Sequence, residues 1–214
     1  QLADVQIIDV RTALQARKTQ LNADETLYFK TDHHWTAQGA WAGYEALMTA
    51  WNKEPLKPGE DFIYQKAAEG FKGTQYSRSG AFWHPGDPIW TWTYTFPFDV
   101  RVVYDQNGDA QTSLFSDQRL NEKDKYMTYL DGNHALVEIE TSSASVEKLL
   151  VIKDSYAHVL VPYLAPHFNQ ITMADLRYYR MPMSQLAQQM GADRILILYS
   201  VDNFCMDTNL GLLK

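Results

Sequence analysis

The stretch Lys148-Leu149-Leu150-Val151-Ile152-Lys153-Asp154-Ser155 is an unbroken apolar run that stops at two small polar residues. Such a run is typical of a strand buried on both faces of a sheet. Further strand-like runs follow at residues 170–174 and 194–199, and helical patterns extend to about residue 164 and over 183–190. Alternating strands and helices predict an α/β fold with a parallel sheet.

Upstream of this stretch, residues 5–10 (Val-Gln-Ile-Ile-Asp-Val) predict another buried strand, and residues 11–18 a short helix. Residues 36–51 predict an amphipathic helix with Thr36 as its N-cap. Its apolar residues fall at helical spacing: Ala40, Tyr44, Leu47, Met48 and Trp51.

The segment 60–146 combines glycines with short aromatic and β-branched runs. Residues 90–96 alternate bulky and hydroxyl side chains, and residues 100–104 precede Asn107-Gly108-Asp109, a hairpin-turn signal. We expect a β-rich insertion over 60–146 within a single domain spanning 1–214. Its aromatic residues could stack on sugar rings or fill the core.

Composition and charge restrict the class of protein to which the chain can belong. The chain has 214 residues, of which 45% are apolar and 21% charged, as in a globular protein. Its net charge of −7 argues against a general nucleic-acid binder. Cys205 is the single cysteine, and no apolar run reaches membrane-spanning length. The chain starts at Gln1 without Met, which predicts that it was cut from something longer, leaving room upstream for a membrane anchor.

The stretch Thr31-Asp32-His33-His34-Trp35-Thr36 gathers a carboxylate and two imidazoles just before the predicted helix. Asp32 and His34 are two apart, so in an extended loop their side chains point to the same side. A carboxylate can then fix the tautomer of the imidazole and stabilise its protonated form. This favours His34 as a general base, although a purely structural loop fits the same residues.

A metal site is the third interpretation of this loop. His33 and His34 are adjacent and are expected to point to opposite sides, which disfavours a shared ion. No other cluster has zinc-like spacing. We therefore predict no metal and no cofactor.

Ser155 follows the predicted strand at a strand-to-helix turn, where ligands bind in α/β sheets. Its backbone N–H would be among the unpaired donors of the helix start and could stabilise an oxyanion. Asp154 or Ser155 could instead be a simple N-cap. An Asp-x-His loop without a nucleophile of its own favours Ser155 as that nucleophile.

Together these blocks resemble the bacterial DHHW family, which is similar to the SGNH-hydrolase-like domain of alginate O-acetyltransferases. The motifs are Thr31–Thr36, Gly73-Thr74 with Ser77 and Gly80, Leu130-Asp131-Gly132-Asn133-His134, Lys153-Asp154-Ser155-Tyr156-Ala157 and Asp202-Asn203-Phe204. The resemblance implies a flavodoxin-like SGNH fold in which the Asp-His block precedes the serine, the reverse of the usual order. It also implies that Asp32 orients, His34 is the base and Ser155 the nucleophile.

The sequence departs from the usual SGNH pattern in three places. Lys153 replaces the glycine of Gly-Asp-Ser, Asp-x-x-His is shortened to Asp-x-His, and Gly-x-Asn-Asp is only loosely matched by residues 200–203. The second oxyanion or substrate-binding group is therefore open among Asn133, Asn203 and Arg177, with Asn133 favoured.

The expected function is serine-dependent hydrolysis or O-acetyl transfer on a cell-surface or extracellular polysaccharide, or another acylated carbohydrate. The acyl donor is left open. The protein is expected to be secreted or membrane-anchored. The alternative is a carbohydrate-binding or surface-assembly module that keeps the fold without turnover.

Overall fold

The computed structural model describes residues 5–22, 25–80 and 82–214. Residues 1–4, on which the expectation of a longer chain rests, lie outside them. The chain divides into two compact units, residues 1–95 and 96–214, and each is described by itself. Among the described residues, no helix is long and apolar enough to span a membrane.

The first unit combines helices with a two-stranded antiparallel sheet. The sheet pairs β1 (Phe62–Phe71) with β2 (Asp87–Tyr94), from Phe62 opposite Tyr94 to Phe71 opposite Asp87. The helices are α1 (Arg11–Lys18), α2 (Ala37–Ala50) and α3 (Thr74–Ser79). Arg17 joins α1 to α2, because its guanidinium donates to Gln38 at 2.8 Å.

The predicted N-cap of α2 is confirmed. Thr36 is extended, and its hydroxyl accepts a hydrogen bond from the Gly39 N–H at 3.3 Å. The first two turns of α2 are buried on every side, so the predicted amphipathic pattern applies only to its second half.

The second unit is built on a six-stranded sheet with the order β4-β3-β5-β7-β6-β8. The strands are β3 (Val100–Tyr104), β4 (Asn107–Gln111), β5 (Leu136–Thr141), β6 (Lys148–Lys153), β7 (Gln170–Ala174) and β8 (Arg194–Leu198). Strand β6 is nearly all buried, since it lies between β7 and β8 with helices above and below it.

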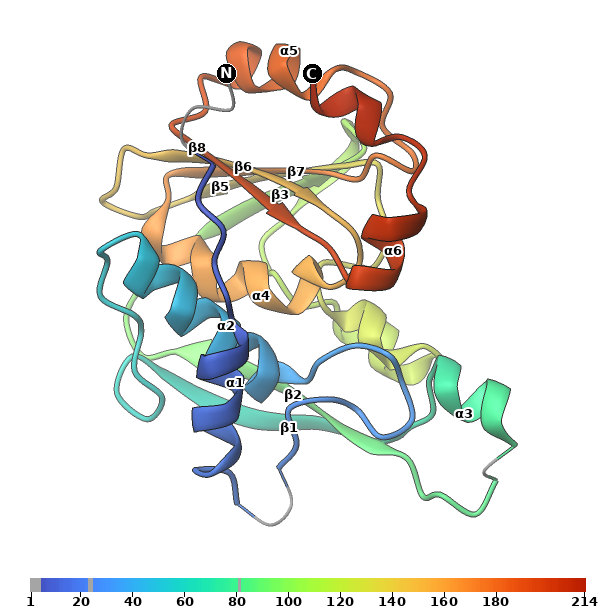
Figure 1. Ribbon diagram of the computed structural model, residues 1–214. Coiled ribbons are helices and arrows are strands. Elements are labelled where there is room, and N and C mark those ends of the chain that lie inside the picture. The colour runs from blue at the N-terminus through green and yellow to red at the C-terminus, as the bar shows by residue number, and fades with distance from the viewer. Residues whose placement is uncertain (1–4, 23–24, 81) are drawn as a thin grey trace. The chain divides into compact units, whose positions relative to one another are not determined.

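Three helices of this unit connect the parallel strands or follow the last of them: α4 (Ala157–Leu164), α5 (Met183–Met190) and α6 (Val201–Met206). Figure 1 shows α4 on one face of the sheet and α5 on the other. Leu150 and Ile152 of β6 pack with Met183 and Leu186 of α5. On the other face, every residue of α4 is buried. These two layers hold the end of β6, and therefore Ser155, in place.

The prediction of a parallel sheet is confirmed for β6, β7 and β8, whereas the sheet as a whole is mixed because strands from the segment 60–146 join it. Strand β6 runs parallel to β7 and β8, whereas β5 is antiparallel to β7, and β3 is antiparallel to β5 and β4. The parallel pairs are joined through helices, while β3 and β4 are joined by two residues, a connection that permits only antiparallel pairing. The segment 60–146 supplies β1 and β2 to the first unit and β3, β4 and β5 to the second.

Two local predictions are wrong. Residues 5–10 form no strand, and Val5 and Ile7 are exposed, because an apolar run becomes a strand only where a partner pairs with it. The hairpin turn lies at Asp105 and Gln106, not at residues 107–109. Both turn residues have positive φ, +52° and +58°, as a two-residue type I′ turn requires.

Candidate functional site

The predicted Asp32–His34 pair is formed. The chain bends over residues 30–34 immediately before α2, and His34 Nδ1 lies 2.5 Å from Asp32 Oδ1. Both side chains are buried, and the same carboxylate oxygen accepts the His34 backbone N–H at 3.1 Å. An Nδ1–H donated to the carboxylate leaves Nε2 as the nitrogen that can accept a proton.

The second oxygen of Asp32 is held by the start of α3. Thr74 donates its backbone N–H to Asp32 Oδ2 at 2.8 Å and its hydroxyl at 3.0 Å. Gly73 makes this approach possible, because a Cβ at residue 73 would lie 2.2 Å from Asp32 Oδ2. Both oxygens of the carboxylate are thus fixed, and with them the His34 ring.

These contacts decide the charge of Asp32. Burial acts to raise its pKa, but hydrogen bonds from His33, His34 and Thr74, together with the charge of His34, hold the pKa well below its usual range. Asp32 is therefore a carboxylate at neutral pH and can stabilise a protonated His34 ring.

A residue that sequence reasoning missed anchors this loop. Asp87, the buried first residue of β2, accepts the Thr31 hydroxyl at 2.5 Å and the Thr31 N–H at 2.8 Å on one oxygen. Its other oxygen accepts the Lys30 N–H at 3.1 Å. No local pattern predicts this contact, since it joins residues more than fifty positions apart.

The prediction that the His33 and His34 side chains point to opposite sides is wrong. The His33 ring does not point away from His34: the two ring centroids are 3.9 Å apart. The alternation of side chains holds for extended backbone, and this loop is bent. His33 Nδ1 pairs with the Thr74 hydroxyl at 2.7 Å, so His33 supports the same residue that holds Asp32.

Asp32, His33 and His34 also offer three possible metal ligands within 4.8 Å of one another. The ligand atoms are already engaged: Asp32 by Thr74 and His34, and His33 by Thr74. An ion would have to replace these hydrogen bonds, so the arrangement fits an orienting carboxylate better than a metal centre.

Ser155 occupies the strand-to-helix turn where sequence analysis placed it. It is buried and lies between the end of β6 and the start of α4. Its carbonyl accepts a hydrogen bond from the Tyr126 hydroxyl at 2.9 Å. The turn is therefore tied to the segment between β4 and β5.

Asp154 builds this turn. One oxygen of its buried carboxylate accepts the Tyr156 N–H at 2.9 Å. The other accepts the Ser200 N–H at 2.9 Å, the Ser200 hydroxyl at 2.8 Å and the Asn203 side-chain amide at 2.7 Å. Asp154 does more than cap a helix, because it joins the loops that follow β6 and β8.

Lys153, in place of the usual glycine, lies beneath the turn and is fully buried. Its ammonium is 2.9 Å from His158 Nε2 and 3.3 Å from Asp175 Oδ2. Burial lowers the pKa of Lys153, while the charge of Asp175 opposes this effect. Arg177 also binds Asp175, through bonds of 2.8 and 2.6 Å, and these bonds raise the pKa of Arg177.

The three predicted oxyanion or substrate-binding candidates lie in the same unit as Ser155. Asn203 gives its amide to Asp154, and the Arg177 guanidinium pairs with Asp175. Asn133 is exposed and accepts from Arg177 at 3.4 Å. Asp32 and His34 belong to the unit of residues 1–95, and Ser155 to that of residues 96–214.

Comparisons with known proteins agree with this description of the fold. A family model described as DHHW protein matches residues 15–174. The structure of a DHHW family protein from Eubacterium siraeum is similar, with a TM-score of 0.78 and 25% identity over 96% of this chain and 67% of that one. Bacillus cereus PatB1, solved with a sulfonyl adduct, gives a TM-score of 0.63 and 24% identity over 91% of this chain and 73% of that one.

The O-acetyltransferase domain of Pseudomonas putida AlgJ is a weaker match, with a TM-score of 0.46 and 14% identity over 96% of this chain and 63% of that one. This likeness is too distant to carry a functional inference. A comparison with curated proteins gives no match.

Proposed function

The chain belongs to the DHHW family, and from that premise we propose that it is a serine-dependent acyl-ester hydrolase or O-acetyltransferase with an SGNH-like fold. Its catalytic residues would be Asp32, His34 and Ser155, with the Asp-His block preceding the serine. The proposed substrate is an acylated polysaccharide or another acylated carbohydrate outside the cell.

One observation carries this proposal: His34 Nδ1 lies 2.5 Å from a buried carboxylate whose two oxygens are both fixed. A carboxylate buried in this way is costly unless its oxygens are hydrogen-bonded. Its chemical use is to hold one imidazole tautomer and to stabilise the ring when it takes a proton. The Asp32–His34 pair has this form, and Ser155 supplies the hydroxyl that such a pair activates.

The reaction would proceed in two steps. The Ser155 oxygen attacks the ester carbonyl carbon while His34 Nε2 takes the hydroxyl proton. The tetrahedral intermediate collapses, the bond to the sugar oxygen breaks, and His34 returns its proton to that oxygen. Water or a second sugar hydroxyl then attacks the acyl carbon while His34 takes its proton. The bond between the acyl carbon and the Ser155 oxygen breaks, His34 returns the proton to that oxygen, and the acyl group leaves as a free acid or a new sugar ester.

The oxyanion of each intermediate needs hydrogen-bond donors. The Ser155 backbone N–H is the first proposed donor, because Asp154 fixes the turn that carries it. Asn133 is the preferred second donor. Asn203 and Arg177 already donate to Asp154 and Asp175, so they would have to share or exchange these partners.

This mechanism requires that the Ser155 hydroxyl come within hydrogen-bond reach of His34 Nε2, about 2.6–3.2 Å, when the substrate is bound. A crystal structure of the chain with a sulfonyl or phosphonyl group on Ser155 tests the requirement directly. A Ser155 oxygen more than about 6 Å from His34 in that adduct would end the triad proposal.

Turnover of a chromogenic acetyl ester is the functional test. Wild-type protein should release the chromophore, and Ser155→Ala should lose at least about 10³-fold in kcat. Ser184→Ala is the matched control, since Ser184 is an exposed serine on α5. Absence of turnover in both proteins would favour the non-catalytic module, and equal turnover in both would remove Ser155 from the mechanism.

We also propose that the protein acts at the cell surface or outside the cell, since its proposed substrate lies there. Fractionation of cells expressing the full-length gene product tests this location. Recovery of that product in the cytosol alone would contradict it.

A further inference from the structure

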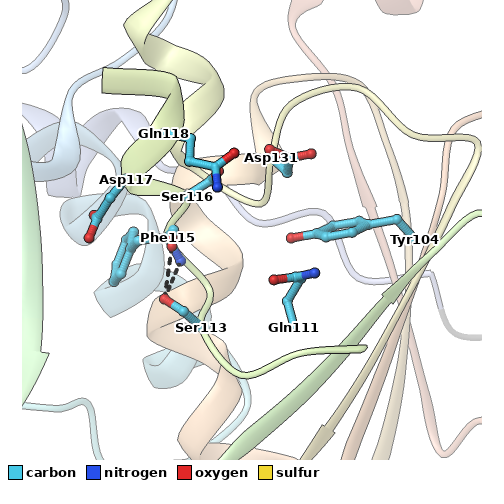
Figure 2. Close-up of a pocket in the computed structure, with 8 residues that line it drawn as sticks. All are labelled: Tyr104, Gln111, Ser113, Phe115, Ser116, Asp117, Gln118 and Asp131. Carbon is cyan, nitrogen blue, oxygen red and sulfur yellow. Dashed lines mark hydrogen bonds between the residues drawn. The ribbon is translucent and has the colours of Figure 1, made fainter. Parts of the chain in front are cut away.

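A second candidate site lies in the unit of residues 96–214, outside the catalytic residues. Its cavity of about 340 Å³ is open to solvent and lies between the β3–β4 hairpin and the segment that leads into the 3₁₀ turn at Asp117–Asn121. Figure 2 shows Tyr104 and Gln111 across the cavity from Ser113 and the segment of residues 115–118. The volume lies within the range of small-ligand sites and suits one sugar ring with ordered water.

The polar lining groups can both donate and accept hydrogen bonds. Gln111 and Gln118 present carboxamides, and Ser116 and Tyr104 present hydroxyls. The hydroxyl groups of a sugar also donate and accept, often through two neighbouring groups at once. This lining therefore matches a polyhydroxylated ring better than an apolar ligand.

The aromatic component is held rigidly. Tyr104 lines the cavity and stacks on His134, with ring centroids 4.3 Å apart and planes 25° apart. His134 is in turn fixed by Asp105, whose Oδ2 lies 2.9 Å from His134 Nδ1. Phe115 adds a second ring to the lining. Aromatic rings that need no reordering can pack against the C–H faces of a pyranose.

The charge of the lining selects against anions. Asp117 and Asp131 carry carboxylates, and none of the described lining residues is basic. The neighbouring Arg119 binds Asp131 through two bonds of 2.7 and 3.2 Å and also binds Glu122 at 3.0 Å. Because Asp131 is paired with Arg119, a uronate or phosphate group would meet like charge mainly at Asp117, whereas a neutral sugar can donate hydroxyl protons to that carboxylate.

The cavity wall shows signs of a built site. Leu130, Asp131 and Gly132 all have positive φ, at +55°, +57° and +93°. Such backbone is costly for residues other than glycine and persists where its surroundings enforce it. The strained segment belongs to the motif at residues 130–134, which the proposed catalytic steps explain only through Asn133, and it carries Asp131 to the cavity.

The wall is also connected to the Ser155 turn within the same unit. Tyr126 lies on the segment that leads from the cavity to Leu130, and its hydroxyl bonds to the Ser155 carbonyl. Asn133, just after the strained residues, reaches Asp175 and Lys153 through Arg177. A sugar in the cavity would thus be held by the chain segment that supports the nucleophile.

We propose that this cavity is a subsite for an uncharged pyranose residue of the polysaccharide. The inference deepens the proposed function and rests on it for the expectation of a carbohydrate substrate. It narrows that substrate to neutral hexose or N-acetylhexosamine polymers, in place of uronate polymers.

Binding to the ¹⁵N-labelled full chain tests the subsite without any turnover. Cellotriose, mannotriose and triacetylchitotriose serve as neutral probes and trigalacturonate as the charged probe. At least one neutral trisaccharide should shift the side-chain amides of Gln111 and Gln118 saturably, with a dissociation constant of about 1 mM. Trigalacturonate should bind at least about tenfold more weakly.

Gln111→Ala and Gln118→Ala should each weaken the neutral sugar about fivefold to tenfold, since each removes hydrogen bonds to the ligand. Gln189→Ala, an exposed glutamine on α5, is the matched control and should bind as wild type does. Failure of all three neutral sugars, unchanged affinity in both variants, or equally tight trigalacturonate would each overturn the subsite. If the chain binds a neutral sugar saturably but lacks esterase activity, the subsite is supported and only the proposed serine chemistry is contradicted.

Discussion

Gly73 and Asp32 lie so close together that a Cβ on residue 73 would be 2.2 Å from Asp32 Oδ2. No carbon and oxygen that are not bonded can share this distance, so a side chain at residue 73 must push the carboxylate away. The Asp32–His34 pair therefore depends on a glycine that has no chemical role of its own.

Gly73→Ala should lower the free energy of unfolding by about 1–3 kcal/mol, because either Asp32 or the start of α3 must move. Gly211→Ala is the control, since nothing lies near the Cβ position of Gly211 and its φ is not positive. Chemical denaturation of the three proteins checks this. Equal denaturation midpoints for Gly73→Ala and wild-type protein would show that Asp32 or the start of α3 moves away at little cost in free energy.

The depressed pKa of Asp32 predicts a pH-dependent stability. Because its folded pKa lies below the unfolded value of about 3.9, its contribution is present above that value and is lost as pH falls toward the folded pKa. Asp32→Asn should therefore cost about 1–3 kcal/mol at pH 7 and progressively less below about pH 4. Denaturation midpoints of both proteins from pH 7 to pH 3 measure the difference, and a constant gap would contradict the assignment.

How far the sequence could predict this molecule depends on whether the decisive contact is local. The buried β6 and the Thr36 cap of α2 were predictable, because an apolar run and a capping residue act within a few positions. Residues 5–10 form an apolar run like that of β6 but no strand, since strand pairing depends on a distant partner. The hairpin turn precedes the Asn107-Gly108 signal for a similar reason, because Asp105 also binds the distant Leu136 N–H.

The candidate site also combines contacts that the local sequence predicts with contacts that it does not. The Asp32–His34 bond spans two residues and follows from the motif. Thr74 and Asp87 complete the loop from more than forty positions away, and only the folded chain reveals their roles. The orientation of the His33 side chain was predicted wrongly, because the rule of alternating side chains assumes an extended backbone. The contacts of Thr74 and Asp87 with this loop bend the backbone instead.

Lys153 should be structurally essential. Lys153→Met removes the donor that His158 and Asp175 share, leaving buried polar atoms without one partner. We expect a loss of about 2–4 kcal/mol in the free energy of unfolding. Lys148→Met, at the partly exposed start of β6, should cost much less. A stabilised Lys153→Met protein would show that apolar packing replaces the buried charge without penalty.

Asp154 should position the serine without taking part in the reaction. Asp154→Ala leaves the donors of Ser200 and Asn203 without their acceptor and frees the Ser155 turn. The expected result is a loss of about 3 kcal/mol in stability and at least a tenfold loss of esterase kcat in the protein that still folds. Asp202→Ala, an exposed carboxylate on α6, is the matched control. Full kcat in folded Asp154→Ala would show that the turn does not need this anchor.

The two histidines give the sharpest test of the base. A sulfonyl fluoride forms a covalent bond to an activated hydroxyl and loses fluoride, and intact-mass spectrometry counts the adducts. His34→Ala should suppress labelling of Ser155 by at least about a hundredfold in rate, because a hydroxyl without a base is a poor nucleophile at neutral pH. Asp32→Asn should also slow it strongly, since the imidazole is no longer held in the productive tautomer.

His33→Ala should label at nearly the wild-type rate in the protein that folds, because the His34–Asp32 bond does not pass through His33 and Thr74 still donates two hydrogen bonds to Asp32. His33 is the matched control for His34, since the two rings are adjacent and 3.9 Å apart. Equal loss of Ser155 labelling in His33→Ala and His34→Ala protein would show that both rings are needed for the base to act. Equal labelling of wild-type and His34→Ala protein would remove His34 from the mechanism and leave Ser155 activated by another group.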